Sequence, residues 1–306
     1  MTIQNVALIG ASGTLGPSIL HALRASEFTP FVLNRHTSKS VYPKTRVITI
    51  PDDLNVTELS SLFKSNAIDA LVIVIAGSYV EEQKKLIEAA YNGGVKRIIP
   101  AEFGSCDSAD DKTVKLLPLM EGKKRVREYL QSFEVKERDG ERGNLTWTSL
   151  VTGHFFDWGL DTGFLKFDIP GRKAYILDGG DIKFSASTLG FIAKAVVKVL
   201  EREAETRNKL LYVHSHYVTQ NEVTDVLDRV VGEKFERVPQ DARTRIEKAR
   251  PKMLEGDHEA TEEVVAVHGI VASDWEGKEG FANAVLGLEL ESLEETIEAV
   301  TKKSSK

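Results

Sequence analysis

The 306-residue chain has very little cysteine and lacks long apolar segments. Its single cysteine, Cys106, excludes an intramolecular disulfide and a cysteine-based metal cluster. The longest apolar run, residues 70–76, is far too short to cross a bilayer. The formal net charge of −6 argues against nucleic acid or an anionic membrane as the main partner. Because no basic segment with an apolar signal core precedes the first apolar run, we expect a cytoplasmic protein.

What the sequence does contain is regularly spaced glycine near its start. Gly10, Gly13 and Gly16 directly follow the apolar run at residues 6–9. A buried strand that leads through a glycine turn into a helix is typical of dinucleotide sites, because the free N–H groups of the helix face the pyrophosphate. The pattern therefore predicts a dinucleotide cofactor. The residues expected to contact it here are Gly10, Ser12, Gly13, Thr14, Leu15 and Gly16.

Through the first half of the chain, apolar runs alternate with amphipathic stretches. This alternation is typical of a parallel sheet covered on both faces. We predict strands near residues 4–9, 30–34, 46–50, 69–76, 96–99 and 145–151. We predict helices near residues 14–26, 56–65, 79–93 and 113–134. The order predicts an α/β fold with a Rossmann doubly wound parallel sheet.

After residue 151 the pattern loosens into loops rich in glycine, aspartate and aromatic residues. A helix near 187–203, a strand near 210–213 and a helix near 219–231 follow, and mainly helices are expected after residue 240. We therefore predict a dinucleotide-binding domain at 1–152 and a smaller C-terminal substrate-binding lobe at 153–306. Some elements of this lobe are expected to rejoin the large sheet.

The end of the second predicted strand indicates which dinucleotide binds. Proteins that prefer NAD usually carry an acid here for the ribose hydroxyls, but residues 31–39 contain none. A guanidinium at this place pairs with a 2′-phosphate, so Arg35, assisted by Ser38 and Lys39, predicts NADP(H). A solvated basic loop is the alternative interpretation. Asp53, just past the third strand, is expected either to approach the adenine or to cap the next helix.

Two segments resemble the isoflavone reductase-like group of the NmrA-like atypical short-chain dehydrogenases. Residues 95–104 resemble the fifth strand and following loop of that group, and residues 120–127 resemble its lysine-bearing helix. The resemblance implies that Lys123 lies near the nicotinamide ribose and assists proton transfer, and that Phe103 lies beside the cofactor. None of the seven tyrosines is followed by lysine four residues later, so the usual Tyr-x-x-x-Lys pair is absent. Without the resemblance, Lys123 would be interpreted as part of a solvated basic face.

The sixth predicted strand leads into a loop with three aromatic residues and a histidine. Ligands of open α/β sheets bind beyond the carboxyl ends of the strands, so this loop predicts a partly aromatic substrate pocket. The predicted substrate residues are His154, Phe155, Phe156 and Trp158. Ordinary packing is the alternative role for each. His214 and His216 are interpreted as packing residues, and no metal is expected.

These observations favour an NADPH-dependent reductase. It would transfer hydride to a small aromatic or polycyclic metabolite, while Lys123 handles a proton or orients the cofactor. The alternative is an NADP(H)-sensing regulator of the NmrA-like type, which contacts another protein without turning over a substrate. The absent Tyr-x-x-x-Lys pair disfavours a sugar-nucleotide epimerase. The sequence leaves the substrate, the type of bond reduced and the stereochemistry open, and it is compatible with a homodimer.

Overall fold

The computed structural model describes residues 3–138, 141–142 and 145–304, which form two compact units. The first unit comprises residues 1–102, 114–150 and 192–211. The second comprises residues 103–113, 151–191 and 212–306. The chain therefore crosses between the units several times, and the segment at 192–211 returns to the first unit.

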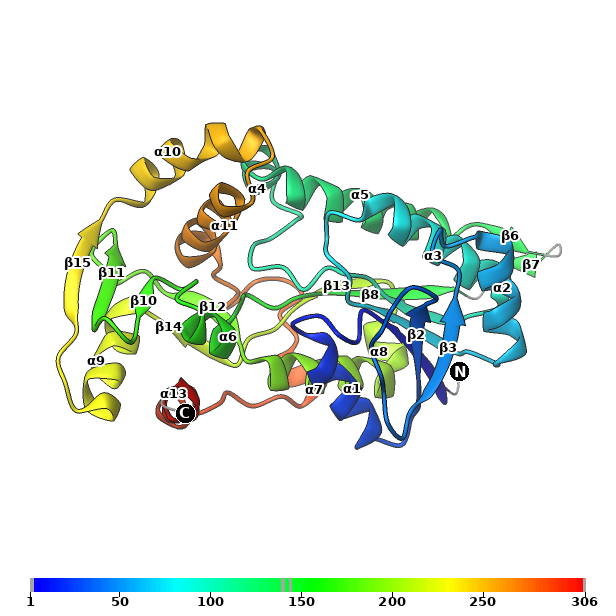
Figure 1. Cartoon of the computed structure of the whole chain (residues 1–306). Helices are drawn as coiled ribbons and strands as arrows, with labels where there is room; N and C mark the ends of the chain where they lie inside the picture. Colours follow the sequence, from blue (N-terminus) through cyan, green and yellow to red (C-terminus); the bar gives the residue numbers. More distant parts are fainter. Residues whose placement is uncertain (1–2, 139–140, 143–144, 305–306) are drawn as a thin grey trace. The chain divides into compact units, whose positions relative to one another are not determined.

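A seven-stranded sheet with the order β13-β8-β5-β4-β1-β2-β3 organises the first unit (Figure 1). Its strands are β1 (Asn5–Ile9), β2 (Thr29–Arg35), β3 (Arg46–Ile50), β4 (Ala70–Ile73), β5 (Arg97–Ile99), β8 (Thr146–Val151) and β13 (Lys209–Tyr212). The neighbours from β3 to β8 pair in parallel. Strand order reverses between β1 and β4, which is the switch point where open α/β sheets hold ligands. The predicted α/β fold with a doubly wound sheet is confirmed.

Helices cover both faces of this sheet, with α2, α3 and α5 on one face and α1 and α7 on the other (Figure 1). The helices are α1 (Gly16–Arg24), α2 (Val56–Ser65), α3 (Val80–Gly93), α4 (Asp111–Leu116), α5 (Pro118–Ser132), α7 (Leu189–Glu201) and α8 (Glu203–Thr206). A short hairpin pairs β6 (Glu137–Arg138) with β7 (Glu141–Arg142). Because the strands are sandwiched, Val6, Ala7 and Leu8 of β1 are all fully buried.

The single helix predicted at 113–134 is wrong, because the chain breaks into α4 and α5. Pro118 has no N–H to donate and restricts the residue before it, and Leu117 is extended with φ −121° and ψ 101°. The break starts α5 afresh at Pro118. The helix predicted at 56–65 is confirmed as α2, whose first turn is capped by the Asn55 side chain.

The second unit contains two small sheets, with the orders β10-β11-β15 and β14-β12-β9. Their strands are β9 (His154–Phe155), β10 (Phe167–Asp168), β11 (Lys173–Leu177), β12 (Phe184–Ser187), β14 (His216–Val218) and β15 (Glu236–Gln240). The helices are α6 (Phe156–Asp161), α9 (Gln220–Val231), α10 (Ala242–Leu254), α11 (His258–Ala272), α12 (Asn283–Leu286) and α13 (Leu293–Ser304). The prediction of loops between residue 151 and the helix near 187 is therefore wrong for the segments that form β9, α6, β10, β11 and β12. No helix in the described part of the chain is long and apolar enough to span a membrane.

Candidate functional site

The glycine turn between β1 and α1 has a backbone that side chains would block. Gly10 has φ +89°, and a Cβ there would lie 2.5 Å from the Val74 carbonyl oxygen. A Cβ at Gly16 would lie 2.2 Å from the Gly10 carbonyl oxygen. The Gly13 N–H donates to that same carbonyl at 3.0 Å. The turn is therefore closed tightly onto the sheet, as a pyrophosphate seat requires.

The first turn of α1 leaves its backbone N–H groups available. Leu15 is the buried N-cap residue, and among the described residues no side chain caps this helix end. Ser12 and Thr14 are exposed in the turn. Uncapped N–H groups and the helix dipole together favour an anionic group at this position.

A cleft of about 360 Å³ extends from the glycine turn to the ends of β2 and β4. It brings together the Gly10–Gly13 backbone, Arg35 at the end of β2, and Ser38. Arg35 and Lys39 are exposed, and Ser38 is half-buried. Tyr42 and Tyr79 also line this cleft. Neither tyrosine is predictable from the sequence, because neither belongs to a spaced motif.

Asp52 holds the loop that follows Arg35. Its Oδ1 accepts hydrogen bonds from the Thr37 hydroxyl at 2.8 Å and from the Thr37 N–H at 3.3 Å. The hydrogen bond from the Thr37 side chain lowers the pKa of Asp52, and the nearby His36 and Arg35 act in the same direction. Asp53, by contrast, accepts the Asn55 N–H at 3.2 Å. The cap of α2 is Asn55, so the capping role considered for Asp53 is wrong.

Lys123 on α5 is held between the loops that follow β4 and β5. Its Nζ donates to the carbonyl oxygen of Glu102, and its aliphatic chain packs on Gly77, where a Cβ would lie 2.8 Å from Cε of Lys123. One helical turn later, the guanidinium of Arg127 contacts the Glu102 carboxylate at 3.1 Å. The side chains of Arg127 and Glu102 are only 8% and 1% exposed. Lys123 is half-buried and Arg127 buried, so these two residues do not belong to a solvated face.

The loop after β5 is fixed on both sides of Glu102. The Ala101 N–H donates to the buried Gln83 side chain at 3.0 Å. Phe103, the first residue of the second unit, is buried with φ +27°. Gly104 then bridges to Val151, and its carbonyl accepts the Thr152 N–H at 3.1 Å. The backbone that the sequence linked to the cofactor is thus firmly anchored.

The predicted substrate residues fall into different surroundings within the second unit. The rings of His154 and Trp158 both contact Phe164, with centroids 5.5 and 5.2 Å away. Phe156 is fully buried and stacks on His216 at 4.4 Å. Phe155 is half-buried in β9. The structure therefore groups His154 and Trp158 around Phe164, a residue that the sequence pattern does not indicate, and separates Phe156 from them.

His154 is neutral at physiological pH. Its Nε2 lies 3.1 Å from the Ala266 carbonyl oxygen and must donate to it, since a carbonyl can only accept. Burial lowers the pKa of His154 to about 4. The ring packs so closely on α11 that a Cβ at Gly269 would lie 2.1 Å from its Nε2. His214 and His216 are also buried, in agreement with the predicted packing roles.

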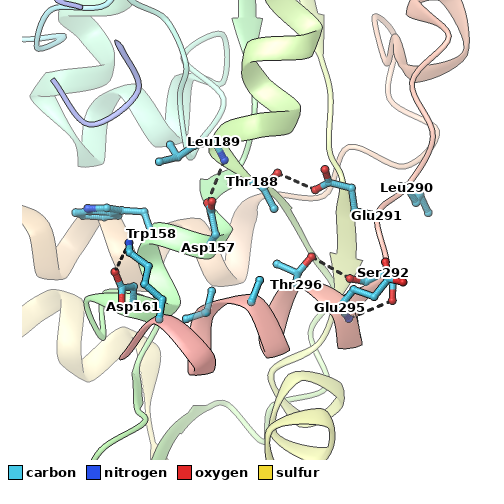
Figure 2. Close-up of a pocket in the computed structure, with 13 residues that line it drawn as sticks. Asp157, Trp158, Asp161, Thr188, Leu189, Leu290, Glu291, Ser292, Glu295 and Thr296 are labelled. Atoms are coloured by element: carbon cyan, nitrogen blue, oxygen red, sulfur yellow. Dashed lines mark hydrogen bonds and ion pairs between the residues drawn. The ribbon is translucent and has the colours of Figure 1, made fainter. Parts of the chain in front are cut away.

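A pocket of about 570 Å³ in the second unit is lined by Trp158 and several carboxylates (Figure 2). Figure 2 shows the Asp157 carboxylate accepting the Leu189 N–H at 3.0 Å at the start of α7. Thr188 beside it donates to Glu291 at 2.7 Å. Burial raises the pKa of Asp157, and the nearby Glu291 contributes. Asp157 and Glu291 thus hold the start of α7, which gives both carboxylates a structural role in this pocket.

The sequence is similar to a known protein family and to known oxidoreductases and reductases. The NmrA-like family model matches residues 2–137. The oxidoreductase aprR of Aspergillus flavus is 32% identical over 99% of this chain and 100% of its own length. Isoflavone reductase homolog P3 of Arabidopsis thaliana is 25% identical over 76% of this chain and 77% of its own length.

A solved structure shares its fold with nearly the whole chain. AtPrR2, in a structure with NADP+ and (+)pinoresinol, superposes with a TM-score of 0.77 at 18% identity. The superposition covers 98% of this chain and 99% of that one. At this identity the likeness concerns the fold. Fold and sequence similarity over the full length agree, and the chain belongs to the NmrA-like family as an oxidoreductase of the isoflavone reductase-like type.

Proposed function

We propose that the chain is an NADPH-dependent reductase that acts on a small aromatic or polycyclic metabolite. The observation that carries the proposal is the arrangement within the first unit. The glycine turn after β1 leaves no space for side chains, and Arg35 lies at the end of β2 on one side of β1. Lys123, which is anchored between the loops that follow β4 and β5, lies on the other side of β1. A cofactor seat and a proton-carrying group thus lie at the carboxyl edge of the same sheet.

The residues of the cleft fit NADP(H). A Cβ at Gly10 or Gly16 would meet neighbouring backbone, so glycine lets the turn and the start of α1 pack closely, as they do in a pyrophosphate seat. Arg35 offers a guanidinium fork for the 2′-phosphate, with Ser38 and Lys39 in the same loop. The NADP+ in the AtPrR2 structure supports this choice. NAD has no 2′-phosphate and would leave Arg35 without its partner.

When bound, NADPH supplies the hydride. Lys123 carries the proton at Nζ, where the Glu102 carbonyl and Gly77 hold its chain in place. A positioned ammonium group can orient a ribose hydroxyl or donate a proton as negative charge develops on a substrate. Trp158 and Phe164, which are half-buried and pack on each other, support an aromatic substrate, because such rings stack on flat ligands. The pinoresinol in the AtPrR2 structure points to the same substrate class.

The test uses NADPH deuterated stereospecifically at C4 and a panel of aromatic metabolites. Turnover should place deuterium in a product from only one of the two labelled forms, and Lys123→Ala should reduce this transfer sharply. NADPH that binds tightly without label reaching any product would contradict the reductase and favour the regulatory alternative. A regulator has no need of a lysine held in this way, which is why we prefer the enzyme.

A further inference from the structure

The candidate catalytic lysine and a buried ion pair share one residue, Glu102. Lys123 and Arg127 are four residues apart on α5 and therefore face the same side of the helix. Lys123 donates to the backbone carbonyl of Glu102, and Arg127 contacts its carboxylate at 3.1 Å. We propose that the Glu102–Arg127 ion pair is a positioning device that sets the location and the proton affinity of Lys123. This inference builds on the proposed function of Lys123.

The ion pair positions Lys123 because it helps to hold the loop that contains Glu102. Ala101, just before Glu102, donates its N–H to Gln83 at 3.0 Å. The carboxylate of Glu102 is clamped by Arg127, and both side chains are almost fully buried. The Glu102 carbonyl therefore has little freedom to turn away. Because it accepts the hydrogen bond from Lys123, its fixed direction fixes the ammonium group.

The ion pair affects the proton affinity of Lys123 through the charges of Glu102 and Arg127. While the pair is intact, its carboxylate and guanidinium carry opposite charges and therefore act on the pKa of Lys123 in opposite directions. Removing the Arg127 charge leaves the Glu102 carboxylate uncompensated, which favours the protonated lysine and raises the pKa of Lys123. Removing the Glu102 charge leaves the Arg127 cation uncompensated, which lowers the pKa of Lys123. The two changes must therefore act in opposite directions, a pattern that simple loss of structure does not produce.

Other charged groups surround α5 but stay constant in these comparisons. On α3, which packs against α5, Glu81 contacts Lys84 at 2.9 Å and Arg125 at 3.6 Å. Glu88 on the same helix contributes, after burial, to the raised pKa of Tyr129. Lys124 lies next to Lys123 on α5. Since none of these groups is altered, their contributions cancel when variants are compared with the parent protein.

The experiment compares Arg127→Met, Glu102→Gln and the double variant with the parent protein. The pKa of Lys123 is read from its 13Cε chemical shift in lysine-labelled protein, with Lys123→Arg used to assign the signal. We expect Arg127→Met to raise this pKa and Glu102→Gln to lower it, each by about one unit, as one uncompensated charge in a partly buried site does. The double variant should return close to the parent value.

Arg127→Lys serves as the matched control, because it keeps the charge and preserves the ion pair at altered geometry. It should leave the pKa of Lys123 within about 0.3 units while reducing kcat, since an ammonium group on a shorter chain does not hold the Glu102 carboxylate in the same place. If Arg127→Met does not fold, Glu102→Gln must still lower the pKa of Lys123, and Arg127→Lys must leave it unchanged. Shifts in the same direction, or no shift in folded variants, would overturn the inference. If the pKa of Lys123 shifts as expected in the variants but no hydride transfer is found, only the proposed function is overturned.

Discussion

Gly77 provides a direct way to move Lys123 without altering its chemistry. Gly77 lies in the loop between β4 and α3, and its φ is outside the left-handed region, so alanine is compatible with its backbone. A Cβ at this position would lie 2.8 Å from Cε of Lys123 and 3.5 Å from Leu119. The substitution Gly77→Ala therefore presses mainly on the lysine chain.

The size of the effect follows from these distances. Ordinary carbon contacts are 3.4–4 Å, so Cε of Lys123 must retreat by about 0.6–1.2 Å. A misplacement of roughly 1 Å in a catalytic group can cost up to ~100-fold in rate. We expect kcat to fall by about 10- to 100-fold, which is ~1.4–2.7 kcal/mol of barrier. Stability should change little, because the flexible lysine chain yields and alanine restricts the unfolded chain.

The assay combines steady-state kinetics with NADPH titration and thermal unfolding. Gly190→Ala is the matched control, because the nearest atom to its added Cβ is the Thr188 hydroxyl oxygen at 3.9 Å. The control should keep the parent rate, and Gly77→Ala should keep NADPH affinity while losing turnover. If Gly77→Ala turned over at the parent rate while Lys123→Ala did not, the link between this contact and Lys123 positioning would be refuted.

Two further predictions concern stability. The pKa of His154 is lowered to about 4 by burial, so the unfolded chain binds a proton more readily than the folded one between about pH 6.5 and pH 4. Between pH 7 and pH 5 the parent protein should lose about 2 kcal/mol more of its free energy of unfolding than the His154→Gln variant, as measured by denaturant unfolding. Equal losses in the two proteins would refute this prediction. Arg97 is fully buried and contacts Glu203 at 3.1 Å. Arg97→Met should lower the free energy of unfolding by about 3 kcal/mol, and a loss below ~1 kcal/mol would show that the pair is dispensable.

The parts of the fold that rest on local patterns could be predicted from the sequence. About a dozen consecutive residues contain β1, the glycine turn and the start of α1, so this motif can be recognised from the sequence alone. The place of Arg35 at the end of β2 could be predicted as well, because the apolar run of the strand precedes it directly. Proline disfavours helix at the residue before it, so the break at Pro118 was open to prediction, but the single helix predicted at 113–134 runs through it.

Features that depend on distant segments could not be predicted. Strand β11 pairs with β15 about 60 residues later, and a five-residue run gives no sign of such a partner. Arg127 belongs to a run of basic residues whose pattern is typical of a solvated helix face, yet it is buried against Glu102. Phe164 joins His154 and Trp158 only because the chain folds back after α6. In each case tertiary packing, rather than local periodicity, decides the outcome.

We propose that the cleft between the glycine turn and β2 binds NADP(H) through Arg35. Calorimetric titration of NADPH and NADH with the parent protein and with Arg35→Ala measures this preference. The parent protein should prefer NADPH, and the variant should lose about 1.5–3 kcal/mol for NADPH while NADH binding stays nearly unchanged. Equal binding of both cofactors by the parent protein, or equal losses in the variant, would contradict the account.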